Sequence, residues 1–175
     1  ILINGEVAED ADTVARIADL ATPLDEIRNN VVANSSAAIE GNRDVCRVME
    51  CEMGNLIADA MLDRVADQGV TIAIANSGGI RASIDAGDVT MGEVLTVLPF
   101  QNTLSTFEVT GEVMVAALEN GVSEIAEVAG RFPQVAGMTF TVDPAAEVGS
   151  RISDVMVGGA AIDLAATYGV VSNNY

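Results

Sequence analysis

Histidine is absent from all 175 residues of the sequence, and this absence excludes several kinds of active site. Histidine is the commonest metal ligand in proteins and the usual general base near neutral pH. A histidine-ligated zinc centre and a Ser-His-Asp triad therefore cannot be built from this chain. We expect it to contribute neither metal-binding nor catalytic residues.

Lysine is also absent, and positive charge is scarce. The chain has 8 basic residues, all arginines, against 26 acidic ones, which gives a net charge of -18. Such an acidic surface repels nucleic acids and anionic membranes, so we expect neither as a partner. No apolar run approaches the roughly 18 residues that a membrane span requires. A phosphate ligand would have to be held by a few local arginines, and Arg47 and Arg81 have the most suggestive surroundings.

Cysteine is limited to Cys46 and Cys51. Two cysteines at this spacing form either a local disulfide, which needs an oxidising compartment, or two unrelated buried thiols. No further cysteine or histidine exists to complete a metal site, which favours the disulfide. A disulfide would place the parent protein outside the cytoplasm. Because the chain begins at Ile1 with neither methionine nor a signal segment, we also expect it to be a piece of a longer protein.

Half of the residues are apolar, enough for one substantial core and hence a single domain. Pro23 should end the first helix, and Thr90 with Glu93 has the pattern of a capping box. Hydrophobic periodicity predicts helices at 9–20, 55–65, 90–98 and 110–122, and strands at 71–75, 103–109, 137–142, 151–157 and 168–172. This mixture indicates an α/β or α+β domain.

The apolar run at 72–75 stops abruptly at Asn76, which is followed by Ser-Gly-Gly-Ile-Arg. A buried strand that ends in an amide, two glycines and an arginine exposes bare backbone and one cation at a sheet edge. This edge suits an anionic ligand. The alternative is that Gly78 and Gly79 simply make a tight turn.

A series of segments along the chain resembles the C-terminal domain of the 5'-nucleotidase family. The segments are CRVMECEMGN (46–55), NSGGIR (76–81), GDVT (87–90), LPF (98–100), FPQVAG (132–137) and YGVVSNNY (168–175). The resemblance implies a four-layer α/β/β/α sandwich over residues 31–175, preceded by an interdomain linker and helix region at 1–30. It also implies that the chain stops just before a Gly-Gly-Asp segment of the family.

The resemblance implies a division of labour within the parent. A separate N-terminal metallophosphoesterase domain, with two divalent metal ions, would hydrolyse the substrate, while this domain binds the nucleotide or nucleoside without a cofactor of its own. The parent would act in nucleotide catabolism, in the periplasm or outside the cell, and this fragment alone would be inactive. Alternative parents cleave 2',3'-cyclic nucleotides, nucleotide sugars, dinucleotides or sulfur-linked substrates. A further alternative is a non-catalytic interaction module that retains the fold.

Base-binding roles follow from the resemblance. It implies that Asn76 hydrogen-bonds the base, that Gly78 and Gly79 lie near the ligand, and that Phe100 and Tyr175 sandwich the base. Pro99 stiffens the backbone before the first aromatic residue. The alternatives are a core position for Phe100 and a frayed chain end at Tyr175.

Phosphate-binding roles follow in the same way for Arg81 and Arg47. An arginine fork binds phosphate oxygens by paired, charge-assisted hydrogen bonds. The alternatives are surface ion pairs of Arg81 with Asp85 or Asp88, and of Arg47 with Glu50.

Three positions depart from the family pattern, and one segment has a structural interpretation. Ser77 and Gln101 stand where many members have glycine, and Tyr175 replaces the more frequent phenylalanine. Phe132, Pro133 and Gln134 are expected to shape a loop near the pocket.

Overall fold

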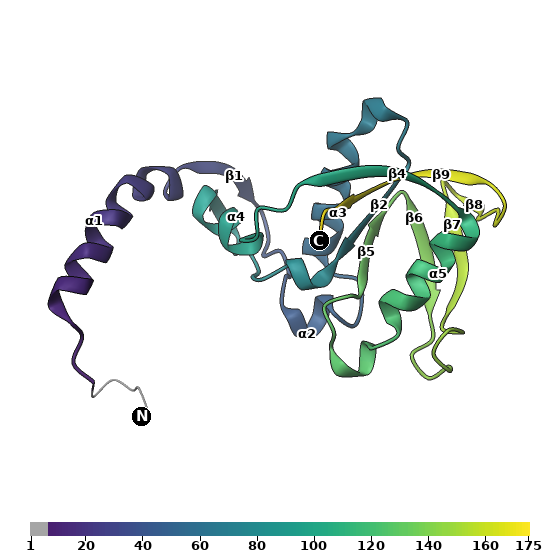
Figure 1. The fold of residues 1–175 in the computed structure, drawn as a ribbon. Helices are drawn as coiled ribbons and strands as arrows, with labels where there is room; N and C mark the ends of the chain where they lie inside the picture. The colour runs from purple at the N-terminus through teal and green to yellow at the C-terminus, as the bar shows by residue number, and fades with distance from the viewer. Residues whose placement is uncertain (1–6) are drawn as a thin grey trace.

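The computed structural model describes residues 7–175 (Figure 1). Its first element, helix α1 (Ala11–Arg28), extends away from the body of the molecule and meets helix α4 at its C-terminal end. The carboxylate of Asp10 accepts a hydrogen bond from the Thr13 N–H at 2.8 Å and caps the helix. The linker and helix region expected at 1–30 includes residues 1–6, which lie outside the described residues.

The prediction that Pro23 ends the first helix is wrong, because α1 continues through it to Arg28. Proline lacks the N–H that would bond the carbonyl four residues back, here that of Asp19. No residue of α1 is buried, so water can hydrate this carbonyl, and the helix tolerates the loss.

A mixed sheet forms the centre of the body, with its strands in the order β4–β9–β2–β5. The strands are β2 (Ile72–Asn76), β4 (Leu104–Thr110), β5 (Pro133–Ala136) and β9 (Thr167–Asn173). Strands β2 and β9 are parallel, and the other pairs are antiparallel. Helix α3 (Glu52–Arg64) covers one face, where Ala58 and Met61 pack against Ala73 and Val171.

The other face of the central sheet packs against helix α5 (Gly111–Val122) and a second sheet. Met114 and Leu118 of α5 share a buried cluster with Ile72 and Val170 of the central sheet. The second sheet is antiparallel and consists of β6 (Met138–Val142), β7 (Ile152–Val157) and β8 (Ala160–Ala161). Two sheets with packed helices confirm the mixed α/β class.

Shorter elements connect these layers. They are β1 (Val31–Ser35), α2 (Arg43–Cys46), β3 (Gly87–Thr90), α4 (Met91–Val97) and the 3-10 turns η1 (Ala66–Gln68), η2 (Ser77–Gly79) and η3 (Ile125–Glu127). The predicted capping box is confirmed at α4: the Thr90 N–H donates to Glu93 Oε2 at 2.7 Å, and the Glu93 N–H donates to Thr90 Oγ1 at 3.3 Å. Within residues 7–175, no helix has both the length and the apolarity to cross a membrane.

The disulfide between Cys46 and Cys51 is confirmed, and a buried amide holds the loop it closes. Gln134 Nε2 donates to the carbonyl oxygens of Cys46 and Met49, both at 2.8 Å. Gln134 Oε1 accepts from the Cys51 N–H at 3.3 Å. The expectation of a loop at 132–134 is therefore wrong, because Pro133 and Gln134 belong to strand β5. Proline fits there because the first residue of an edge strand needs no N–H for the ladder.

Candidate functional site

A cleft of about 760 Å³ opens beyond the C-terminal end of strand β2. Its walls come from η2, the segment after α2, the segment after α4, the loop before β5 and the chain end after β9. Every residue predicted to bind substrate lines this cleft, namely Arg47, Asn76, Gly78, Gly79, Arg81, Phe100 and Tyr175. Residues from well-separated parts of the sequence therefore meet at one place. The volume of the cleft lies within the range of small-molecule binding sites.

The backbone of η2 packs against the loop before β5. The Gly78 N–H donates to the Gly130 carbonyl at 2.7 Å, and a Cβ atom added to Gly130 would lie only 2.7 Å from Gly78 Cα. Neither glycine has a positive φ. An added Cβ at Gly78 would lie 3.0 Å from the Gly130 carbonyl oxygen, so close approach, rather than a left-handed turn, favours glycine at both positions. At Gly79 an added Cβ would meet only Asn76 Oδ1, at 4.0 Å.

Arg47 and Arg81 place positive charge in the cleft without acidic partners. Ion pairs among residues 7–175 involve neither of them. The side chain of Glu50, one of the alternative partners, instead accepts a hydrogen bond from Asn55 Nδ2 at 2.7 Å. Asp88 likewise accepts one from Asn34 at 2.9 Å.

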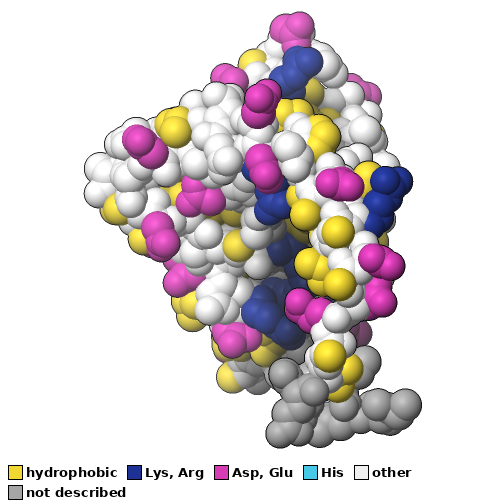
Figure 2. Space-filling model, turned by 90° about the vertical axis from the view of Figure 1, so that its left-hand side faces the viewer, with side chains coloured by type: hydrophobic (Ala, Val, Ile, Leu, Met, Phe, Trp, Pro, Cys, Tyr) yellow, Lys and Arg dark blue, Asp and Glu magenta, His cyan; other side chains and the backbone are white. Residues whose placement is uncertain are grey.

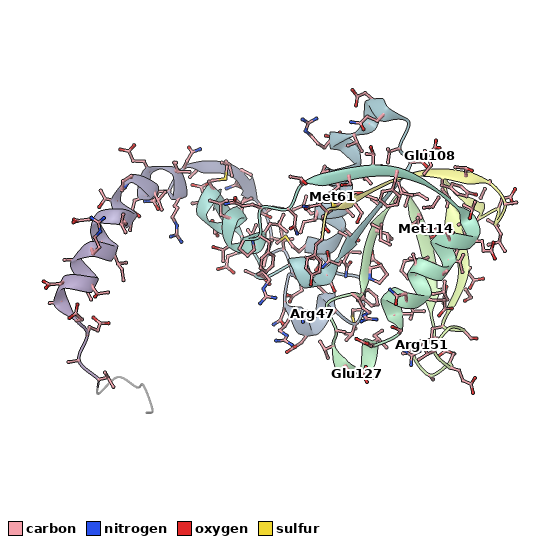
Figure 3. The ribbon with its side chains drawn as sticks, in the orientation of Figure 1. Arg47, Met61, Glu108, Met114, Glu127 and Arg151 are labelled. Carbon is pink, nitrogen blue, oxygen red and sulfur yellow. A yellow bond between two sulfur atoms is a disulfide. The ribbon has the colours of Figure 1, made fainter. Side chains whose placement is uncertain are left out.

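Arg47, which is labelled in Figure 3, is half-buried. Burial, with the nearby charges of Arg43 and Arg81, lowers the pKa of Arg47 from its ordinary value. Its Nη1 donates to the Val128 carbonyl at 3.4 Å, while its Nε is buried without a hydrogen-bond partner. Arginine stays charged despite such a shift, so the cleft retains a partly desolvated cation. This is favourable for an anionic ligand.

The two aromatic residues predicted to sandwich a base are both exposed. The side chain of Phe100 is 56% exposed and that of Tyr175 is 93% exposed, so Phe100 is not a core residue. Gln101, directly after Phe100, has a φ of 53°. This left-handed conformation explains why glycine suits the position, since other residues adopt it at a cost of about 1 kcal/mol.

Asn76 is oriented by a neighbour that the sequence did not single out. Asn173 Nδ2 donates to Asn76 Oδ1 at 2.8 Å, linking the ends of β2 and β9. The bond directs the Asn76 oxygen toward Asn173 and leaves its NH₂ group as the donor for a ligand. Parallel pairing of β2 and β9 brings these ends together, and only the tertiary structure reveals it.

A third arginine, Arg131, lines the cleft and was missed by the sequence reasoning. It forms an ion pair with Glu124 at 3.2 Å. The sequence did offer one indication of its role, because Arg131 lies between Gly130 and the FPQVAG segment that carries part of the family resemblance. In a protein of net charge -18, three of eight basic residues thus line one cleft. Figure 2 shows arginine side chains gathered near the middle of one face, among scattered acidic ones.

The donor set does not fit a metal ion. Among residues 7–175, no group of three or more His, Cys, Asp or Glu side chains converges on one point. The cleft offers hydrogen-bond donors, cations, aromatic faces and one carboxylate, that of Glu124, which is paired with Arg131. These groups can bind a ligand.

Comparisons with known proteins place the chain within a family. Residues 31–175 match the family described as "5'-nucleotidase, C-terminal domain". The chain is 37% identical over 179 residues to the trifunctional nucleotide phosphoesterase protein YfkN of Bacillus subtilis, covering 99% of this chain and 12% of that protein. Among solved structures, it resembles the 5'-nucleotidase precursor of Thermus thermophilus with a TM-score of 0.89, at 42% identity over 96% of this chain and 34% of that one.

The NAD nucleotidase of Haemophilus influenzae is also similar, with a TM-score of 0.75 and 27% identity over 95% of this chain and 32% of that one. These likenesses confirm the predicted fold. The chain spans about a third or less of the length of each of these proteins.

Proposed function

The chain belongs to the 5'-nucleotidase C-terminal domain family, and on this premise we propose that it is the nucleotide-recognition domain of a longer phosphoester hydrolase. One observation carries the proposal: a single cleft holds two arginines that pair with no acid among residues 7–175, together with two exposed aromatic rings. Phosphate and base are the two parts of a nucleotide that such groups recognise.

In the proposed complex, Arg47 and Arg81 donate hydrogen bonds to phosphate oxygens. The base stacks between Phe100 and Tyr175, and the Asn76 NH₂ group donates to an acceptor on the base. Charge-assisted bonds contribute about 1.5 to 3 kcal/mol each, and stacking contributes about 1 to 3 kcal/mol per base. Gly79 lets the ligand approach the backbone, because a Cβ atom added there would meet only Asn76 Oδ1, at 4.0 Å.

Hydrolysis itself is assigned to another part of the parent. The chain lacks histidine, and its described residues offer no cluster of metal ligands. We therefore place two divalent metal ions, and the water that they activate, on an N-terminal metallophosphoesterase domain that is the partner of this one. The disulfide supports a location in the periplasm or outside the cell, and so does the description of the Thermus thermophilus relative as a precursor.

A binding experiment with a matched control tests the proposal. NMR titration of the ¹⁵N-labelled chain measures affinity for AMP, adenosine and ribose 5-phosphate. Phe100→Ala is expected to weaken AMP and adenosine about tenfold while sparing ribose 5-phosphate, because only the first two carry a base. Phe107→Ala removes an exposed ring outside the cleft and should change none of the three. Unchanged AMP affinity in Phe100→Ala would contradict the proposal.

A second experiment tests the division of labour. AMP and Mg²⁺ or Mn²⁺ added to the chain should yield no phosphate above the uncatalysed background. Steady phosphate release that depends on the concentration of the chain would show that the chain itself is catalytic.

A second candidate substrate for the parent is a dinucleotide, which the name of the Haemophilus influenzae relative favours. Comparison of NAD with AMP in the same titration separates the two. Tighter binding of NAD than of AMP would favour the dinucleotide.

A further inference from the structure

A second hollow opens beside the cleft, between the ends of β2 and β9 and the C-terminal half of α5. We call it the alcove; its volume is about 200 Å³. It shares Asn76, Arg131 and Tyr175 with the cleft, so the two spaces are adjacent. Arg47 and Arg81, the proposed phosphate ligands, line only the cleft. The alcove therefore lies on the base side of the proposed nucleotide site.

Amide and hydroxyl groups give the alcove its polar character. Asn76, Asn120, Ser172 and Asn173 line it, and Arg131 is its one charged residue among those described. The Glu124 carboxylate, 3.2 Å from Arg131 Nη2, offsets that charge. A surface of amide groups with one guanidinium, whose charge is offset by Glu124, suits the edge of a heterocycle better than it suits a second phosphate.

The guanidinium of Arg131 is held in place by three partners. Nη1 donates to Asn120 Oδ1 at 3.4 Å and to Ser123 Oγ at 3.3 Å, and Nη2 faces Glu124. Arginine has five N–H donors, so these contacts leave the Nε–H and one Nη2–H. Both donors belong to the rigid, planar guanidinium, which can present such donors to a ligand as a fork.

We propose that the alcove receives the outer edge of a purine base and that Arg131 is a specificity-determining residue, which favours 6-oxopurines over adenine. This inference rests on the proposed function. Guanine and hypoxanthine present two acceptors, O6 and N7, which match a two-donor fork. Adenine presents N7 together with an amino donor, so one N–H of the fork would face another N–H.

The test compares GMP with AMP by NMR titration of the ¹⁵N-labelled chain. The wild-type chain should bind GMP about tenfold more tightly, as expected for one bidentate contact. In Arg131→Met the ratio of the two dissociation constants should fall toward one. Arg131→Lys retains the positive charge but loses the fork, so the ratio should fall in the same way. The amide spectrum of each variant reports whether it is folded.

Arg16→Met is the matched control, because Arg16 lies on the exposed helix α1, outside both spaces. It makes the same change in charge and should preserve the tenfold ratio. A wild-type chain that binds GMP and AMP equally would overturn the inference, and so would a ratio that survives both Arg131 substitutions. Selective loss of ADP binding relative to AMP in Arg131→Met would assign Arg131 to a second phosphate and would also overturn it.

Failure of the inference and failure of the proposed function give different results. If nucleotides bind in a Phe100-dependent manner but base preference ignores Arg131, only the inference fails. If neither AMP nor GMP binds, or if Phe100→Ala changes neither, the proposed function fails and the inference fails with it.

Discussion

The guanidinium carbon of Arg81 lies 5.8 Å from the centre of the Phe100 ring. The proposed phosphate ligand thus contacts the proposed base platform in the free protein. Arg81 Nη1 also donates to the Gly78 carbonyl at 3.4 Å, so the Arg81 side chain contacts both η2 and Phe100. A cation over an aromatic face is attracted by about 0.5 to 1 kcal/mol at exposed sites. Each residue therefore helps to position the other.

This contact predicts that the two residues act together in binding. Arg81→Met and Phe100→Ala should each weaken AMP affinity, and the double mutant should lose less than the sum of the single losses, by about 0.5 to 1 kcal/mol. A double-mutant cycle with NMR-derived dissociation constants measures the difference. Arg81→Met combined with Phe107→Ala serves as the control cycle and should be additive. Additive losses in both cycles would show that the contact contributes nothing to binding.

Arg47 and Arg43 offer a matched pair for the phosphate contact. Arg47 lies in the cleft, whereas Arg43 is 63% exposed and ion-paired with Asp44. Arg47→Gln should weaken AMP binding about tenfold or more while leaving adenosine binding nearly unchanged, because only AMP carries the phosphate. Arg43→Gln should affect neither ligand by more than about twofold, since exposed ion pairs are weak and screened. Equal losses for AMP and adenosine in Arg47→Gln would rule out a phosphate contact.

Local signals in the sequence were sufficient for much of the fold. The capping box at Thr90 and Glu93 formed as predicted, because both of its hydrogen bonds lie within one helical turn. The alternating strand predicted at 103–109 likewise followed from neighbouring residues and corresponds to β4. The helix end at Pro23 was mispredicted because full exposure of α1 outweighs the usual effect of proline.

Features that depend on tertiary contacts could not be predicted from the sequence. Strand β5 begins with Pro133 and is four residues long, so its sequence resembles a loop until the pairing with β2 is seen. The contacts of Arg131 with Asn120 and Glu124 depend on how the loop after α5 folds back. All the site residues that the family resemblance implied line the cleft. The partners that orient these residues could not be predicted from the motifs.

Replacement by alanine is expected to have different effects at the two glycines of η2. Gly78→Ala would place a Cβ 3.0 Å from the Gly130 carbonyl oxygen and should destabilise the fold by about 1 to 3 kcal/mol. Gly79→Ala has room and should leave stability within about 1 kcal/mol, but its methyl group should weaken AMP binding, since it occupies the ligand's approach. Urea denaturation and NMR titration measure the two effects. Loss of stability in both variants, with AMP affinity unchanged in Gly79→Ala, would show that the two glycines only form a structural turn.

The capping box at α4 predicts a pH-dependent contribution to stability. Hydrogen bonds from the Thr90 backbone N–H and then from its hydroxyl lower the pKa of Glu93 from its ordinary value of 4.5. A carboxylate with a lowered folded-state pKa stabilises the fold above its unfolded-state pKa, and this contribution disappears as the pH falls through the folded-state pKa. Urea denaturation should find Glu93→Gln less stable than the wild-type chain at pH 7, with the gap closing below pH 4.5. Glu112→Gln is the control, because α5 has Val113 where a capping box needs Glu or Gln. A gap that stays constant down to about pH 3 would contradict the assignment.

Gln134 is predicted to control both the stability of the disulfide loop and the affinity for phosphate. Its side chain is 1% exposed and holds the carbonyls of Cys46 and Met49 on either side of Arg47. Gln134→Met keeps a similar volume but leaves these carbonyls without donors, which should cost about 3 kcal/mol in the free energy of unfolding. Because the loop then loses its anchor, AMP affinity should fall while adenosine affinity changes less.

The control for this prediction is Gln68→Met, which alters an amide in η1. Turn η1 follows the C-terminal end of α3, whereas the disulfide loop precedes its N-terminal end. It should change the unfolding free energy by less than about 0.5 kcal/mol. Reduction of the disulfide provides a second comparison, since Gln134 should still hold the loop when the Cys46–Cys51 bond is broken. If reduction abolishes AMP binding in the wild-type chain while Gln134→Met leaves it unchanged, the covalent bond alone positions Arg47. Retained binding after reduction, together with loss in Gln134→Met, would assign that role to the buried amide.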